Sequence, residues 1–179
     1  RPHLREISQV APMITIESAG TNWARSYDTT MVRMLFVGSL IRDKGIFDII
    51  DALLVLRRRD VDFEFHFVGG GSDIITLKNS VENKRLTQQV RIHGLISDPT
   101  TLSRMYDESD LFVYPTYHEG FPRVLYEAMS RGLPTITTPV GAIPSLLEDG
   151  HNCLFVPPHN PDQLADTMFK LMADSPIRE

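Results

Sequence analysis

The 179 residues are enough for one domain, and a hydrophobic content of 42% is ordinary for a globular core. A formal net charge of −5 argues against nucleic-acid binding, which needs a basic surface. A single cysteine, Cys153, excludes an intramolecular disulfide and suits a reducing compartment. No run approaches the roughly 18 apolar residues of a membrane-spanning helix, and no signal-peptide pattern opens the chain, so we expect a cytoplasmic protein and leave membrane association open.

Residues 1–30 show no sustained hydrophobic period. Residues 11–16 fit a short strand, and the polar segment that follows is typical of a loop. Because the chain begins with Arg1 rather than Met, we expect it to be part of a longer protein.

From Met31 onward the pattern becomes regular, and strands and helices alternate. We expect strands at 32–37, 63–68, 90–94, 110–114, 135–138 and 153–156. We expect helices at 44–59, 73–85 with Asp73 as N-cap, 98–107 with Asp98 and Pro99 at its start, 121–131, 143–148 and 162–172. This alternation predicts an α/β domain over 31–174: a Rossmann-like, doubly wound parallel sheet of about six strands with helices on both faces. Residues 175–179 would form a tail.

The stretch from His118 to Met129 combines a loop and the start of a helix directly after a buried strand. Glu119 lies in the loop, and Glu127 follows it with seven residues in between. Open α/β sheets bind ligands where strand ends meet helix starts, and helix starts favour anions. Two carboxylates beside an anion site repel the anion, so their presence there suggests a ligand that also carries hydrogen-bond donors. Hydroxyl groups of a ribose or sugar are such donors, because carboxylates accept their hydrogen bonds strongly.

The sequence His-Glu-Gly-Phe-Pro followed by Glu-Ala-Met resembles a motif of retaining GT-B glycosyltransferases. Further matches are Phe-Val-Gly at 36–38 with Lys44-Gly45, and Thr-Pro-Val-Gly at 138–141 with Glu-Asp-Gly at 148–150. Together they resemble the C-terminal, donor-binding domain of the group 1, or family 4, type, which would be one half of a GT-B fold. By this resemblance residues 1–30 are an interdomain linker and strand remnant, and the N-terminal acceptor domain is absent from the chain.

The resemblance implies roles for the two glutamates and their neighbours. Glu127 would bind the ribose hydroxyls of the donor nucleotide, and Glu119 would lie beside the transferred sugar with a catalytic role. Donor contacts are also implied for Gly120, Phe121, Pro122 and Leu125. The alternatives without a role in ligand binding are a surface ion pair of Glu127 with Arg123, a solvated glutamate in the loop at 119, and core packing of the helix for Leu125.

Lys44 is the expected catalytic cation, which would neutralise the departing diphosphate without a metal or other cofactor. As an ordinary lysine at a helix start it would oppose the helix dipole, which favours the functional interpretation. The family usually has an arginine after the glycine of the first loop, but here Ser39 follows Gly38. Arg42 is the candidate substitute.

The remaining expectations concern the base and the cleft. Backbone groups of Leu95 and Ile96 match the position where family members hold the nucleotide base. The loop from Val140 to Ala142 resembles a segment that lines the cleft, with a simple turn as the alternative. His118 is more typical of a loop histidine than of a catalytic one.

The resemblance implies transfer of a hexose from a UDP-, GDP- or ADP-sugar to an acceptor hydroxyl, in polysaccharide or glycolipid synthesis. The acceptor, a glycan, lipid or protein, would bind mainly to the missing domain, so the chain alone should turn over little. The alternatives are a nucleotide-sugar epimerase of similar fold, against which the glutamate spacing argues, and a non-catalytic nucleotide- or partner-binding domain, which the serine at 39 favours.

Overall fold

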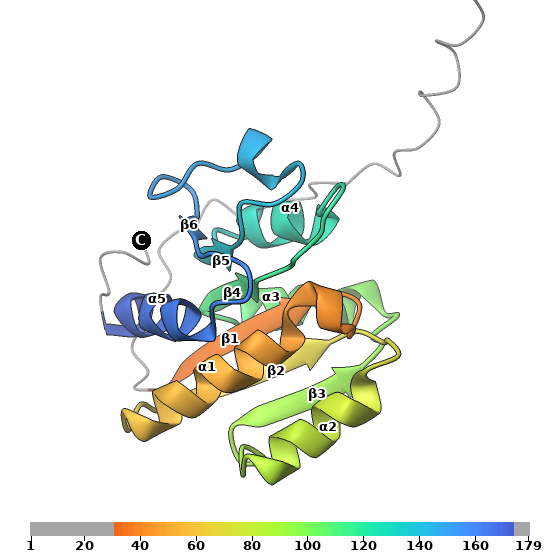
Figure 1. Ribbon diagram of the computed structural model, residues 1–179. Helices are drawn as coiled ribbons and strands as arrows, with labels where there is room; N and C mark the ends of the chain where they lie inside the picture. The colour runs from red at the N-terminus through yellow and green to blue at the C-terminus, as the bar shows by residue number, and fades with distance from the viewer. Residues whose placement is uncertain (1–30, 174–179) are drawn as a thin grey trace, which may run out of the picture.

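Residues 31–173 are described by a computed structural model, and they form one six-stranded parallel sheet with helices on both faces (Figure 1). The strands are β1 (Val32–Val37), β2 (Phe63–Val68), β3 (Val90–Gly94), β4 (Leu111–Tyr114), β5 (Thr135–Thr137) and β6 (Leu154–Phe155). The helices are α1 (Ile46–Arg58), α2 (Ile74–Asn83), α3 (Pro99–Asp107), α4 (Arg123–Met129) and α5 (Pro161–Ala173), with short 3-10 helices η2 (Arg42–Lys44) and η3 (Ile143–Ser145). The predicted Rossmann-like α/β fold is confirmed. The predictions for the linker at 1–30, the strand at 11–16 and the tail at 175–179 lie outside the described residues.

The strand order is β3-β2-β1-β4-β5-β6. Strands β2 and β3 are therefore added on one side of β1, and β4, β5 and β6 on its other side. Strands β1 and β4 are neighbours, with Met34 opposite Leu111. In open sheets of this kind, ligands bind beyond the carboxyl ends of the strands at the point where the order reverses. The fold therefore places the loops after β1 and β4 side by side at that point.

The two faces of the sheet are covered by different helices. Helices α1, α2 and α5 lie on one face, and α3 and α4 on the other (Figure 1). In β2 the side chains of Phe63, Phe65 and Phe67 are buried on one face of the sheet, as the alternation of apolar and polar residues along this strand predicts. Among the described residues, no helix is long and apolar enough to cross a membrane.

The helix predicted at 44–59 begins later than expected. Residues Arg42–Lys44 form η2, and Gly45 in the left-handed conformation, with φ of 69°, separates it from α1. A Cβ at Gly45 would lie 2.1 Å from the carbonyl oxygen of Pro115, so the close approach of the two loops requires glycine. Lys44 therefore lies outside the first turn of α1, and the expectation that its charge opposes the dipole of that helix was wrong.

Other element ends also differ from the predictions. Asp73 does precede α2, but its carboxylate accepts a hydrogen bond from the Arg42 backbone N–H at 2.9 Å instead of capping the helix. Helix α4 is confined to seven residues and begins after Pro122. Asp98 caps α3 as predicted, because its Oδ2 accepts the Thr101 backbone N–H at 2.8 Å.

Candidate active site

Two oppositely charged side chains meet at the point where the strand order reverses. Lys44 Nζ lies 2.8 Å from Glu119 Oε2, and both side chains are largely buried, with 18% and 11% of their surface exposed. Lys44 Nζ also donates to the His118 carbonyl oxygen at 3.0 Å. The ammonium group thus uses two of its three hydrogens on the loop after β4.

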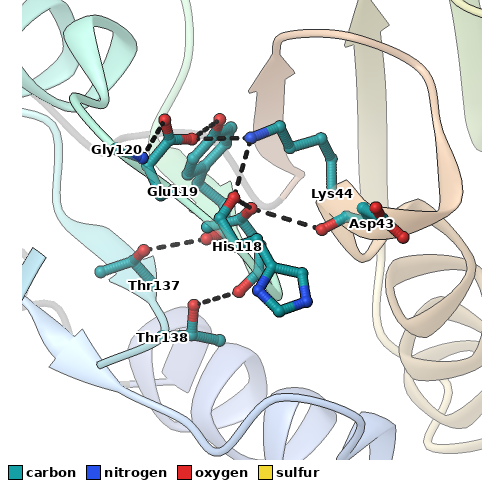
Figure 2. A network of polar contacts seen from close by, with 9 residues as sticks. Asp43, Lys44, His118, Glu119, Gly120, Thr137 and Thr138 are labelled. Atoms are coloured by element: carbon teal, nitrogen blue, oxygen red, sulfur yellow. Dashed lines mark hydrogen bonds and ion pairs between the residues drawn. The ribbon is translucent and has the colours of Figure 1, made fainter. Parts of the chain in front are cut away.

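The loop that carries Glu119 is held from both sides by hydrogen bonds (Figure 2). On the β5 side, Thr137 Oγ1 donates to the Tyr114 carbonyl oxygen at 2.9 Å, and Thr138 Oγ1 donates to that of Thr116. On the β1 side, the Tyr117 backbone N–H donates to the Asp43 carbonyl oxygen at 2.8 Å. The threonines at 116, 137 and 138 are buried, so the two hydrogen bonds on the β5 side are shielded from water and hold the loop in place.

A third segment closes on the same loop because it contains a glycine. Gly141 has φ of 56°, and a Cβ there would lie 1.8 Å from the Glu119 carbonyl oxygen. Only glycine allows this approach, so the loop from Val140 to Ala142 packs directly against the backbone of Glu119.

Glu119 is held as a carboxylate. Its Oε2 accepts the Tyr114 hydroxyl at 2.6 Å in addition to Lys44, and its Oε1 accepts the Gly120 N–H at 3.2 Å. Burial alone would raise the pKa of Glu119, but the hydrogen bonds from Lys44 and Tyr114 outweigh it and the pKa is lowered. At neutral pH this residue can therefore accept hydrogen bonds but cannot donate a proton.

A cavity of ≈590 Å³ opens beside this ion pair, within the size range of small-molecule sites. It is lined by Lys44, Tyr117, His118, Glu119, Gly120, Val140 and Gly141. The structure thus brings together the predicted Lys44, Glu119 and Gly120, together with the loop predicted to line a cleft.

The other predicted donor-binding residues lie outside the lining of this cavity. Gly38 and Ser39 follow β1, Leu95 and Ile96 follow β3, and Phe121, Pro122, Leu125 and Glu127 follow Glu119 along the chain. Leu95 and Phe121 are exposed, whereas Leu125 is 1% exposed in the core, which supports the packing alternative for that residue. The donor-binding roles of this group stay predictions.

Glu127 does not form the ion pair with Arg123 that its spacing allowed. Its Oε2 accepts a hydrogen bond from the Tyr106 hydroxyl at 2.8 Å, which links α4 to α3. The side chain of Glu127 keeps partial exposure to solvent.

Arg42 does not take the place of the missing arginine in this structure. Its guanidinium lies over the ring of Phe47, 4.5 Å from the ring centroid, and lines a different hollow with residues of α2. Among the described residues that line the cavity beside Glu119, Lys44 is the one lysine or arginine.

Three tyrosines that were not predicted from the sequence contribute to the two glutamate sites. Tyr114 and Tyr106 hold the two glutamates, and Tyr117 lines the cavity. The signal for Tyr114 was its position at the end of an otherwise apolar strand, since a buried tyrosine hydroxyl needs a partner. Over the residues that the structure describes, no group of three or more His, Cys, Asp or Glu is placed to hold a metal ion.

Comparison with known proteins gives a consistent picture. The profile of the family "Glycosyl transferases group 1" matches residues 25–179. An uncharacterized glycosyltransferase, MJ1178, of Methanocaldococcus jannaschii is 32% identical over 145 residues, which are 81% of this chain and 39% of that protein. The chain therefore spans about two fifths of that relative's length.

Solved structures show the same architecture. The C-terminal domain of the group 1 glycosyl transferase LpcC from Francisella tularensis is 27% identical, with a TM-score of 0.73 over 83% of this chain and 78% of that domain. HepE from Anabaena, in complex with UDP and glucose, has a TM-score of 0.71 at 23% identity, over 83% of this chain and 40% of that one.

Proposed function

The chain belongs to the glycosyl transferases group 1 family, and from this we propose that it is the donor-binding domain of a retaining hexosyltransferase. In this proposal it binds a nucleoside diphosphate sugar and presents the sugar to an acceptor hydroxyl. The match over most of a domain described as C-terminal in LpcC supports the assignment to the donor half. The complex of HepE with UDP and glucose supports a nucleotide sugar as the ligand class.

The observation that carries the proposal is the pairing of Lys44 with Glu119 beside a cavity at the point where the strand order reverses. A cation there can neutralise a diphosphate, and a carboxylate within reach of the same atoms can accept hydroxyl hydrogens of a sugar. A nucleoside diphosphate sugar carries both kinds of group, one directly after the other.

In the proposed reaction, the bond between the anomeric carbon and the phosphate oxygen breaks, and its electron pair leaves with the diphosphate. Lys44 stabilises the charge that develops there, an effect worth about 3–4 kcal/mol for comparable preorganised donors. The acceptor oxygen forms the new bond on the same face of the sugar, and its proton passes to an oxygen of the departing diphosphate. Glu119, as a carboxylate, orients the sugar through its hydroxyl groups and does not act as an acid.

The proposal assigns the nucleoside to residues outside the cavity lining. Glu127 accepts the ribose hydroxyls, and backbone groups at Leu95 and Ile96 meet the base. The acceptor, a glycan, lipid or protein in polysaccharide or glycolipid synthesis, is bound by another domain of the full-length protein. We therefore expect the chain alone to bind donor and to transfer little.

A non-catalytic nucleotide-binding domain is the second candidate, and a specific observation favours it. With serine at 39 and Arg42 packed on Phe47, the lining of the cavity contains a single fixed cation for two phosphates. Sugar transfer by the full-length protein separates the two candidates, because a domain of the second kind binds nucleotide without turnover.

Thermal unfolding against UDP, GDP and ADP and their common sugar derivatives tests the proposal. A ligand that binds only the folded state raises the midpoint, and a hundredfold excess over the dissociation constant contributes about 2.7 kcal/mol. We expect a shift with one nucleotide that is lost in Lys44→Ala and kept in Lys84→Ala. Lys84 pairs with Asp51 on α1 and is the matched control for loss of a partly buried lysine.

A shift of equal size in Lys44→Ala and the wild type would contradict the role of Lys44. No shift with any nucleotide, in this chain and in the full-length protein, would overturn the proposed function as a whole.

A further inference from the structure

We propose that Tyr106 is a positioning residue that holds the Glu127 carboxylate in place for the ribose of the donor. This inference rests on the proposed function, because it takes Glu127 as the ribose acceptor. It assigns a part in ligand recognition to a core residue of α3.

The first observation is the hydrogen bond between two helices. Tyr106, at the C-terminal end of α3, is 1% exposed, and its hydroxyl donates to Glu127 Oε2 at 2.8 Å. Burial, followed by the nearby Glu127 charge, raises the pKa of Tyr106 above its ordinary value. The hydroxyl therefore keeps its proton and acts as a donor at every physiological pH.

The second observation is that the tyrosine ring is itself fixed. Its centroid lies 5.7 Å from that of Phe112 on β4, and the Arg131 guanidinium lies over the ring, 5.2 Å from the same centroid. Arg131 Nη1 also donates to the Glu127 carbonyl oxygen at 3.1 Å, and Arg131 Nε lies 3.2 Å from Asp107 Oδ1. Both the backbone and the carboxylate of Glu127 are therefore tied to the same joint between α3 and α4.

This arrangement suits a carboxylate that must meet a pair of adjacent hydroxyls. A glutamate side chain has several rotatable bonds, and ordering it on binding reduces affinity. With Oε2 anchored by Tyr106, that ordering is complete before the ligand arrives. Oε1 and the second lone pair of Oε2 are left to accept two hydrogens. The 2′- and 3′-hydroxyls of a ribose present two such donors side by side.

The alternative is that Tyr106 only stabilises the joint between the helices. Both roles predict some loss of thermal stability when the hydroxyl is removed, so stability cannot separate them. Discrimination between a ribonucleotide and its 2′,3′-dideoxy form separates the two roles when Tyr106→Phe is compared with a variant that loosens the same joint but keeps the hydrogen bond to the Glu127 carboxylate.

The experiment measures dissociation constants of the intact chain for UDP, GDP and ADP and for their 2′,3′-dideoxy forms by calorimetry. For the wild type we expect one ribonucleotide to bind roughly ten- to a hundredfold more tightly than its dideoxy form. In Tyr106→Phe we expect ribonucleotide affinity to fall roughly three- to tenfold while dideoxy affinity is unchanged. In a Glu127→Ala background the Tyr106→Phe change should have no further effect on the ratio.

Ser103→Ala is the matched control. Ser103 Oγ accepts a hydrogen bond from Arg131 Nη2 at 3.0 Å at the same joint, but it does not contact the Glu127 carboxylate. This variant should keep the wild-type ratio between the two ligands. If it lowers the ratio as much as Tyr106→Phe does, loosening of the joint explains the effect and the positioning role is overturned.

The possible outcomes separate the inference from the function on which it rests. If Glu127→Ala lowers the ratio and Tyr106→Phe does not, the positioning role fails and the proposed function stands. If the wild type does not discriminate, or binds none of the three nucleotides, the role of Glu127 or the proposed function fails, and the inference fails with it. Should Tyr106→Phe not fold, Glu127→Asp withdraws the carboxylate from Tyr106, and an unchanged ratio in that variant would contradict the inference.

Discussion

Lys44 Nζ and Glu119 Oε2 lie 2.8 Å apart although the two residues are 75 positions apart in the sequence. In this structure the cation proposed to meet the donor phosphates is already paired with the carboxylate proposed to meet the sugar. Binding of a diphosphate must therefore compete with Glu119 for the same ammonium group.

This competition predicts an unusual effect of Glu119→Gln. Removal of the negative charge beside Lys44 should tighten binding of a free nucleoside diphosphate by up to roughly tenfold, because a pair of unit charges near a protein surface interacts by a few kcal/mol, part of which is screened. Sugar transfer by the full-length protein should fall, since a neutral amide accepts hydroxyl hydrogens less strongly. Calorimetry with the diphosphate alone, beside an assay of transfer, measures both effects. Weaker diphosphate binding in this variant would show that Glu119 does not compete for Lys44.

The same carboxylate should make stability depend on pH in the acid range. The pKa of folded Glu119 is lowered below its ordinary value of 4.5 despite burial, through Lys44 and Tyr114. The unfolded chain therefore takes up the proton first as pH falls, so this contribution is present above about pH 4.5 and is lost as pH falls through the folded pKa. Urea unfolding of the wild type and Glu119→Gln between pH 7 and pH 3 should give a stability difference that shrinks below that point. A difference that does not change with pH would contradict it.

A pair of histidines on β2 and β3 should produce a second pH dependence, nearer to neutrality. His66 Nδ1 and His93 Nε2 lie 2.9 Å apart, and burial lowers the pKa of both from the ordinary value of 6.5. Glu64 partly offsets the shift at His66, whereas Arg33 and Arg91 add to it.

Because the folded pKa values are lowered, the unfolded chain binds protons first as pH drops below 6.5. The free energy of unfolding should then decrease toward pH 5.5, with a slope of at most about 1.4 kcal/mol per pH unit for each histidine. His93→Gln should flatten this slope in urea unfolding series. A wild-type slope of zero between pH 7 and pH 5.5 would show that the pair does not titrate as described.

Gly141→Ala should destabilise the fold by about 2–4 kcal/mol. The new Cβ would collide with the Glu119 carbonyl oxygen, and the backbone there has a positive φ, which alanine tolerates poorly. Gly150→Ala is the control: its φ is 73°, but nothing lies within 4 Å of the added Cβ, so the cost should be about 1 kcal/mol. If Gly141→Ala and Gly150→Ala lose equal stability in thermal or urea unfolding, the backbone has shifted enough to remove the collision with Glu119.

Much of the fold could be predicted from local patterns. The alternation of apolar strands with helices implied a parallel sheet, and Asp98 before Pro99 located the start of α3, because hydrophobic period and capping are properties of neighbouring residues. The prediction that α1 begins at Lys44 was wrong, since the need for glycine at 45 comes from Pro115, far along the chain. Asp73 is the N-cap residue of α2 as predicted, but its carboxylate accepts the Arg42 backbone N–H and forms no capping hydrogen bond, for a similar long-range reason.

Local sequence was enough to identify the residue types available for a donor site, because Glu119, Glu127 and Lys44 lie in recognisable positions after strands. The folded chain was needed to show that Lys44 and Glu119 form one pair and that Arg42 packs on Phe47. It was also needed to show that Tyr106 and Tyr114 hold the two carboxylates. These contacts arise because the order of strands in the sheet makes β1 and β4 neighbours and so brings together loops that share no local pattern. Contacts of side-chain hydroxyls and charges follow from that juxtaposition and not from spacing along the chain.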